Sequence, residues 1–288
     1  MSNTVKKRDA NILRRLFTVL TFAVLIFFAL GQTFPFYLEL VRSVQPKNYI
    51  PKFGSFELWP TGFNFGNYVT AVREADMARG FLNTFIVAGS YVILSAANCL
   101  VAGYVLGKKN FRGKNVVFFG LLATMMVPGE VLLAPNYWLM LQFRFEDKLI
   151  ALILPGMINA LGIFLVRQYM VTIPDSIIES VKIDGAKQFT IIRKIILPLA
   201  LPILGTYCII TFISLWNDYL WPMIIIKTPS RYTLQLKLME FVPSSFGSPE
   251  FNKTLRSAGL MVTLVPVLIL YAVFQKQFVQ GISISGMK

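Results

Sequence analysis

The chain has 288 residues, of which 55% are hydrophobic and 15% are charged, and a soluble domain of this size could not bury so much apolar surface. A net charge of +14 would indicate nucleic acid in a soluble protein. Here it fits basic residues that flank membrane spans and meet anionic lipid, so we expect a lipid partner and no nucleic acid. The chain has no histidine, and Cys99 and Cys208 both lie in apolar runs, which argues against imidazole catalysis, a metal site and a disulfide.

The N-terminal segment, residues 1–15, is strongly basic and precedes a charge-free run over 16–38. That run is longer than the apolar core of a secretory signal, and no small-residue cleavage site follows it. We therefore expect a tail at 1–15 and a first membrane span at 16–38.

Five further stretches are long and apolar enough to cross a bilayer, which takes about 20 helical residues. The runs are continuous rather than alternating, which favours helices over a barrel. The sequence thus predicts an all-α membrane protein with a single six-helix domain over 16–275. The expected spans are 16–38, 80–107, 115–143, 149–166, 195–226 and 257–275.

The distribution of basic residues predicts the orientation of these spans. If the N-terminus is inside, the inner segments hold 16 of the 28 Lys and Arg residues, in agreement with the positive-inside rule. Both termini, including a tail at 276–288, and the segment between spans four and five are then cytoplasmic. The long segments 39–79 and 227–256 lie outside and are expected to contain turns and short helices.

The cytoplasmic segment 172–198 reads as a helix–turn–helix. Pro174 suits the first turn of a helix, and Ile177, Ile178 and Val181 lie at helical spacing and predict one apolar side. The pair Asp184-Gly185 predicts a break, because glycine tolerates positive φ beyond a helix end. Such a short helix must pack on something, and the residues alone leave lipid, its own bundle and a partner protein as alternatives.

Two acidic residues and one neighbouring amide within the expected spans are candidates for a functional role. Glu130 interrupts the third span, and Asn217 and Asp218 lie late in the fifth. Ionisable groups in hydrocarbon are costly and often face a substrate path or a wet cavity, so these residues are candidates for the translocation path or gate. Helix–helix hydrogen bonding and an interfacial position are the alternatives. Pro-Gly pairs at 128–129 and 155–156 predict kinks.

The helix–turn–helix also resembles the EAA loop of permease subunits in ABC importers. Glu179 is followed six residues later by Gly185, and Ile195, Leu197 and Pro198 fall in register with the end of that pattern. Ser180-Val181 replaces its Ala-Ala pair. Nearly the whole chain is similar to the maltose-type carbohydrate permeases, the binding-protein-dependent transport inner-membrane components, through FGNYVTAV, FLNTFIVAGS, MVPGEVLLAP, SLWNDYLWP and FQKQFVQGISISG.

The resemblance implies a MetI-like permease in a bacterial cell membrane that imports a sugar or an oligosaccharide. In this family the loop is a coupling helix that inserts into a cytoplasmic ATPase. Glu179 would make the charged contact, Gly185 would set the angle between the two short helices, and Ala186 would allow close approach. Ser180 and Asp184 complete the expected docking site.

The resemblance also implies three partners, namely an ATPase dimer, a second homologous permease and an extracytoplasmic solute-binding protein. The chain contains no G-x-x-x-x-G-K-[ST], so ATP and Mg²⁺ are expected on the ATPase and no cofactor or catalytic residue on this chain. Two alternatives are a permease for another organic solute, such as a glycerophosphodiester, and an ion-coupled secondary transporter. A membrane enzyme is a third.

Overall fold

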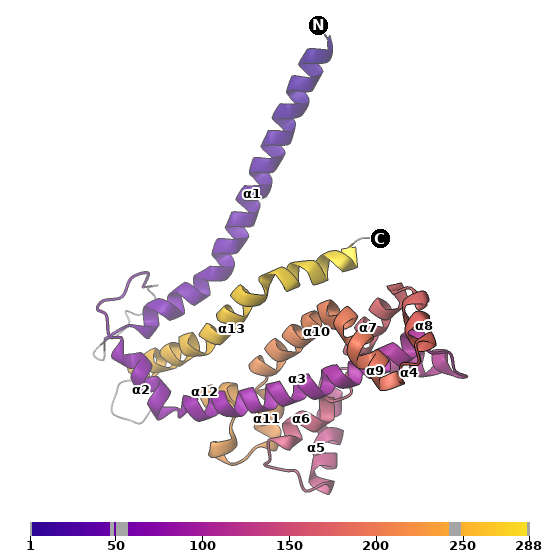
Figure 1. The fold of residues 1–288 in the computed structure, drawn as a ribbon. Coiled ribbons are helices and arrows are strands. Elements are labelled where there is room, and N and C mark those ends of the chain that lie inside the picture. The colour runs from indigo at the N-terminus through magenta and orange to yellow at the C-terminus, as the bar shows by residue number, and fades with distance from the viewer. Residues whose placement is uncertain (1, 47–48, 50–56, 242–248, 287–288) are drawn as a thin grey trace. The chain divides into compact units, whose positions relative to one another are not determined.

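A computed structural model describes residues 2–46, 49, 57–241 and 249–286 (Figure 1). The chain forms two compact units, Met1–Glu74 with Val242–Val262 and Ala75–Phe241 with Thr263–Lys288. The described elements are helical, as predicted. They are α1 Ser2–Ser43, α2 Gly66–Glu74, α3 Met77–Lys108, α4 Lys114–Thr124, η1 Gly129–Leu132, α5 Leu133–Gln142, α6 Ile150–Ile153, η2 Leu154–Gly156, α7 Ala160–Thr172, α8 Asp175–Ile183, α9 Gln188–Ile191, η3 Ile192–Ile196, α10 Leu197–Asn217, α11 Leu220–Ile225, η4 Pro229–Arg231, α12 Leu234–Glu240 and α13 Pro249–Gly286.

Four of the described helices are long and apolar enough to cross a membrane, and up to six spans result if two bent helix pairs each count as one. The four are Arg14–Ser43 within α1, α3, the run Gln188–Asn217 and Lys253–Gln275 within α13. The helices α1 and α13 extend through residues 2–13 and 276–286, so the described parts of the two expected tails are helical. Residues 50–56 and 242–248 of the two expected outer segments lie outside the described residues.

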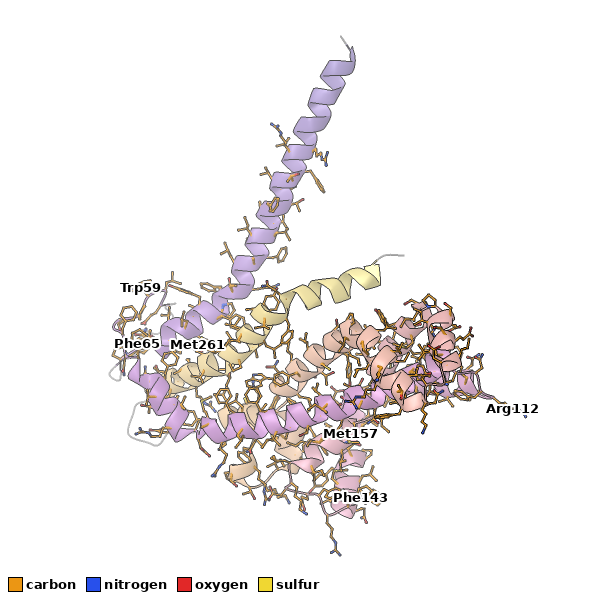
Figure 2. The ribbon with its side chains drawn as sticks, in the orientation of Figure 1. Trp59, Phe65, Arg112, Phe143, Met157 and Met261 are labelled. Carbon is orange, nitrogen blue, oxygen red and sulfur yellow. The ribbon has the colours of Figure 1, made fainter. Side chains whose placement is uncertain are left out.

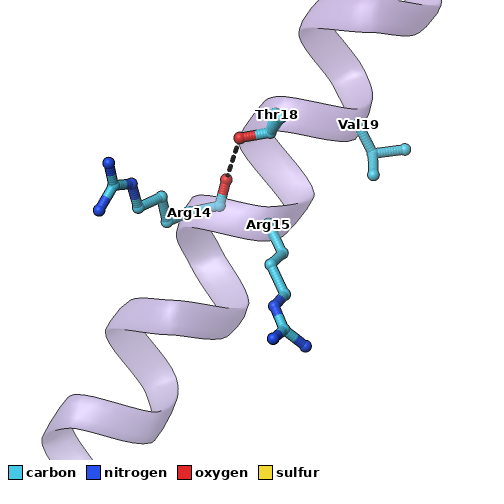
Figure 3. A pocket seen from close by; sticks show the side chains of 4 residues that line it. All are labelled: Arg14, Arg15, Thr18 and Val19. Carbon is cyan, nitrogen blue, oxygen red and sulfur yellow. Dashed lines mark hydrogen bonds between the residues drawn. The ribbon is translucent and has the colours of Figure 1, made fainter.

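The first unit is built around the end of α1, α2 and the first part of α13. The apolar run of α1 begins just after Arg14 and Arg15, which project from different sides of the helix and line a surface hollow with Thr18 and Val19 (Figure 3). Thr18 donates to the backbone oxygen of Arg14 at 2.8 Å. Because the Thr18 hydroxyl is hydrogen-bonded within its own helix, it needs no partner elsewhere and does not interrupt the apolar surface of α1.

The loop that follows α1 is held by buried polar groups. Asn67 Nδ2 donates to the carbonyl oxygens of Ser43 at 2.9 Å and Gln45 at 2.8 Å, and Tyr68 and Ser43 share a hydroxyl contact of 2.7 Å. Glu39 accepts a hydrogen bond of 2.5 Å from Ser257 on α13. Because unmatched buried polar groups are costly, these bonds fix the chain where α1 ends.

The second unit has α3 at its centre, with α7, α10 and α12 packed along it. Figure 1 shows α4, α8 and α9 near one end of α3. The main core cluster lies between α3, α7, α8 and α10, and its buried members are Cys99, Leu100, Tyr104, Leu106, Phe118, Ile163, Val166, Met170, Ile173, Ile178, Ile191, Ile196, Ala200, Leu204 and Tyr207.

Two expected spans are broken in the structure. The segments Lys114–Thr124 and Gly129–Gln142 meet at 95°, and Ile150–Gly156 and Ala160–Thr172 meet at 47°. The first break ends at the predicted pair 128–129 and the second directly follows the pair 155–156, as expected because proline removes a backbone donor and clashes with the preceding turn. Asn159 then restarts the second half by accepting a bond from the backbone N–H of Gly162 at 3.0 Å.

The stretch expected as a fifth span at 195–226 has different limits in the structure. The helical run begins at Gln188 and ends at Asn217, and α11 is a separate short helix. A π-helical turn, Ile192–Ile196, precedes α10. It lies beside Pro198, which lacks the N–H that would continue the regular ladder.

Candidate functional site

The helix α8 has sharply defined ends that its sequence explains. Ile173 and Pro174 adopt extended backbone angles, so α7 ends before them and α8 begins after them. At the other end Gly185 has φ +79°. Its N–H donates to the oxygen of Lys182 at 3.0 Å, and the N–H of Ala186 donates to the oxygen of Val181 at 3.3 Å. These two bonds form a Schellman motif, which confirms the predicted break.

The inward side of α8 packs on the protein's own core. Ile178 is buried in the main cluster, and Val181 and Ala186 are half-buried against it. Of the alternatives left open for the apolar side made by Ile177, Ile178 and Val181, packing on the chain's own bundle holds for Ile178 and Val181, which cover its end. Helical spacing identified the apolar face but not what covers it. The contact of Val181 with the same cluster as Ala186 also stabilises the Schellman turn.

A lysine at the end of α3 holds the start of α8. Lys108 Nζ donates to Asp175 Oδ1 at 2.7 Å and also to the backbone oxygen of Ile173. The Lys108 side chain is only 6% exposed. Its hydrogen bond and its charge lower the pKa of the Asp175 carboxyl. Because a buried ammonium requires partners, this pair fixes α8 to α3.

The outward side of the element presents carboxylates together with apolar side chains. Glu179, Ser180, Asp184 and Gly185 are all exposed, so four of the five predicted docking residues are accessible to a partner, and Ala186 is half-buried. Two large apolar side chains also stand on this surface: Ile183 is 86% exposed and Phe189 is 73% exposed. Exposed apolar groups next to charged groups on a fixed turn are typical of a protein contact surface.

Sequence reasoning missed Ile183 and Phe189, because an apolar residue in a mostly apolar chain carries no signal of its own. The residues could have been suspected from their positions on either side of the Asp184-Gly185 break. We call Glu179, Ser180, Ile183, Asp184, Gly185 and Phe189 the turn surface.

Behind the turn surface, α3 and α7 touch almost backbone to backbone. A Cβ added to Gly103 would lie 2.5 Å from Val166 Cγ1, and one added to Gly107 would lie 2.7 Å from Met170 Cβ. Glycines four residues apart form one flat ridge on a helix, which allows such close packing in membranes. This G-x-x-x-G signal was available in the sequence and predicts the interface. It makes α3 and α7 one rigid pair that carries α8.

The three candidate path residues do not form a single cluster through any interaction seen in the described residues. Glu130 is exposed on η1, in the break between α4 and α5. Asn217 is the last residue of α10, and its amide donates to the oxygen of Ile213 at 3.0 Å. Asp218 follows in extended backbone, where its carboxylate accepts a 3.4 Å contact from the N–H of Trp221 in α11. The two acidic residues therefore lie at helix breaks rather than inside straight spans.

A charged cluster links the loop after α5 to the loop after α11, and sequence reasoning missed it. Asp147 accepts from the backbone N–H groups of Lys227 and Thr228, each at 2.9 Å, and pairs with Arg231 at 2.6 Å. Burial raises the pKa of Asp147, but these bonds and the Thr228 hydroxyl outweigh it and lower the pKa to about 2. The partners lie 80 to 84 positions apart, so only the folded chain brings them together.

Known proteins are similar to this chain in sequence and in architecture. A family model described as "Binding-protein-dependent transport system inner membrane component" matches residues 100–284. The arabinooligosaccharides transport system permease protein AraQ of Halalkalibacterium halodurans is 29% identical over 99% of this chain and 100% of its own length. The sn-glycerol-3-phosphate transport system permease protein UgpE of Salmonella choleraesuis is 30% identical over 73% of this chain and 74% of its own.

A solved structure has a fold similar to that of this chain. The crystal structure of a bacterial ABC transporter involved in the import of the acidic polysaccharide alginate contains a chain that aligns with a TM-score of 0.81 at 26% identity. The alignment covers 91% of this chain and 96% of that chain.

Proposed function

Because the chain belongs to the family of binding-protein-dependent transport system inner membrane components, we propose that it is a permease subunit of an ABC importer that carries a sugar or an oligosaccharide into the cell. AraQ, whose name specifies arabinooligosaccharides, aligns over nearly the whole chain, and the alginate transporter shares its architecture. The relative named for sn-glycerol-3-phosphate aligns over a smaller share, so another organic solute, such as a glycerol phosphate or a glycerophosphodiester, is the second candidate.

The turn surface is where the ATPase of this importer docks. The observation that carries this assignment is that exposed apolar side chains stand on an element that is itself fixed to the bundle. Ile183 and Phe189 project without cover, while Lys108 and Ile178 fix the same helix to the bundle. A docked ATPase would bury the apolar pair, and its motion would pass into α3 and α7 without being lost in a flexible loop.

The remaining parts of the importer follow from the same proposal. ATP and Mg²⁺ belong to the ATPase dimer, and the solute arrives with an extracytoplasmic binding protein. A second, homologous permease completes the path. The chain crosses the bacterial cell membrane six times with both termini in the cytoplasm, and the two bent helix pairs each count as one span. Glu130, Asn217 and Asp218 border the translocation path or its gate.

A crosslinking experiment tests the docking site. In a chain with Cys99 and Cys208 replaced by serine, Ile183→Cys should crosslink to the ATPase in the assembled complex. Val116→Cys is a matched control, because Val116 is also strongly exposed, at 76%, but lies on α4. Crosslinks from position 183 that reach only lipid or this chain would overturn the proposal.

A charge reversal tests the functional side of the same contact. Glu179→Lys should abolish solute uptake while the folded protein remains in the membrane, since Glu179 is exposed and its replacement disturbs no core packing. Glu179→Gln keeps the shape and should retain more uptake than the lysine variant. Normal uptake by Glu179→Lys would remove this residue from the docking contact.

A further inference from the structure

A hollow at the turn between α3 and α4 is lined by charged and polar groups. Its volume is about 480 Å³. The lining residues are Asn110, Phe111, Gly113, Lys114, Asn115, Val116 and Arg167. The hollow lies at the end of α3 that also holds α8, because Lys108 is the last residue of α3 and pairs with Asp175.

The electrostatic balance of this hollow is strongly positive. Lys114 and Arg167 line it, and Lys109 and Arg112 stand beside it in the turn. Asp175, whose pKa is lowered mainly by Lys108 and also by the charge of Lys114, forms its ion pair with the buried ammonium of Lys108. The first turn of α4 contains no acidic residue. The hollow therefore has cationic groups without a matching anion among the described residues.

Arg167 lines the hollow and is held by contacts within the chain, one of which is a 3.0 Å hydrogen bond from its Nη1 to Gln168 Oε1. Its guanidinium lies over the ring of Phe118, 4.2 Å from the ring centre, and Phe118 in turn stacks on Phe164. The Nε group of Arg167 is buried and has no hydrogen-bond partner in the described part of the chain. A buried donor without an acceptor is costly, so the site gains from an oxygen-bearing anion or an ordered water.

An exposed apolar surface begins directly beside the hollow. On α4, Val116 is 76% exposed and Phe119 is 65% exposed, and Phe111 in the preceding turn is also exposed. A free phosphate ion would gain nothing from these side chains. A molecule with an anionic head and hydrocarbon tails would satisfy both surfaces at once.

We propose that this hollow binds the headgroup of an anionic phospholipid, with the acyl chains along α4. The headgroup phosphate bridges Lys114 at the start of α4 and Arg167 on α7. Binding therefore ties α4 to the helix that leads into α8. That the lipid belongs to the cytoplasmic leaflet rests on the proposed function, because it follows from ATPase docking at the same end. The binding itself does not depend on that function.

The test measures lipid retention by the complete transporter complex, without ATP or solute. The purified complex is offered equal amounts of phosphatidylglycerol and phosphatidylcholine with identical acyl chains, and bound lipid is counted by native mass spectrometry. We expect wild type to prefer phosphatidylglycerol. Lys114→Gln should weaken that preference about fivefold, as expected for the loss of one basic residue near an anionic surface, and Lys114→Arg should preserve it. Lys148→Gln, in the loop after α5, is the matched control.

Three outcomes would overturn the proposal. The first is equal retention of both lipids by wild type, and the second is an unchanged preference in Lys114→Gln. The third is displacement of phosphatidylglycerol by inorganic phosphate alone, which would indicate a site that binds anions without any contribution from the acyl chains. Arg112→Gln provides a second variant with an exposed side chain, so a folding defect at Lys114 cannot decide the result. A complex that binds the lipid but fails to couple ATP hydrolysis would refute the proposed function and leave the lipid site standing.

Discussion

Replacing Gly185 by alanine should uncouple the ATPase without unfolding the chain. Gly185 has φ +79°, and a Cβ built there meets no heavy atom within 4 Å. The substitution therefore creates no clash with neighbours, and its whole effect comes from the backbone. An L-residue in the left-handed region costs about 1–2 kcal/mol.

The chain can relieve this strain only by giving up the Schellman turn. The affected bonds are those from the N–H groups of Gly185 and Ala186 to the oxygens of Lys182 and Val181. If the ATPase binds the turn only in its present shape, the strain lowers the population of the binding-competent state. A cost of about 1–2 kcal/mol corresponds to roughly five- to thirty-fold weaker docking.

The assay is titration of the purified ATPase against the permease complex in proteoliposomes, together with solute-stimulated ATP hydrolysis. Gly185→Asn should lie closer to wild type, because asparagine tolerates the left-handed conformation. Gly205→Ala is the matched control: Gly205 lies within α10, and a Cβ there also meets nothing within 4 Å. Wild-type docking by Gly185→Ala would refute the reasoning, and so would an equal loss in Gly205→Ala.

Three further predictions concern other parts of the second unit. Asp147→Asn should lower the free energy of unfolding by about 1–3 kcal/mol at neutral pH. The pKa of Asp147 in the folded chain, about 2, lies below the ordinary value of an aspartate. The extra stability of wild type is therefore complete above the ordinary pKa, and melting curves should show that it disappears as the pH falls towards 2. Gly162→Ala places a Cβ 2.5 Å from Cys99 Sγ and should cost about 1–3 kcal/mol by overpacking, while Gly89→Ala, which meets nothing within 4 Å, should melt like wild type. Asp218→Ala should change the rate or the solute preference of uptake if the residue borders the path; an unchanged uptake profile with slightly lower stability would assign it to capping α11 alone.

Hydropathy alone identified the apolar stretches from which the helices form, because a bilayer requires long continuous apolar runs. The Pro-Gly pairs also located both breaks. Their angles, 95° and 47°, could not be predicted, since proline removes one hydrogen bond but tertiary packing sets the direction of the next segment. The limits of the run Gln188–Asn217 were missed for a related reason. The π-helical turn before Pro198 lets a charged stretch continue as a helix beyond the apolar residues.

The candidate site shows the same division between local and distant information. The turn at Gly185 is a local property of the chain, so sequence predicted it. Which face of α8 is covered depends on α3 and α10, and the Lys108–Asp175 pair joins residues 67 positions apart. Spacing within one helix contains no information about such partners. The glycines of α3 are intermediate, because their G-x-x-x-G spacing predicts a close helix neighbour without identifying α7.

If the ATPase docks at the turn surface as proposed, the attachments of α8 explain how nine residues could transmit its motion. A helix of this length is marginal in water on its own, yet α8 is fixed at its start by Lys108, in its middle by Ile178 and at its end by the Schellman turn. A force applied at the exposed Ile183 therefore moves α8 together with α3 and α7 rather than unwinding it. Because Gly103 and Gly107 leave no side chain between α3 and α7, little of that displacement is absorbed by repacking. In the proposed importer, the ATPase would contact the exposed turn, and the attachments of α8 would pass its motion to the bundle.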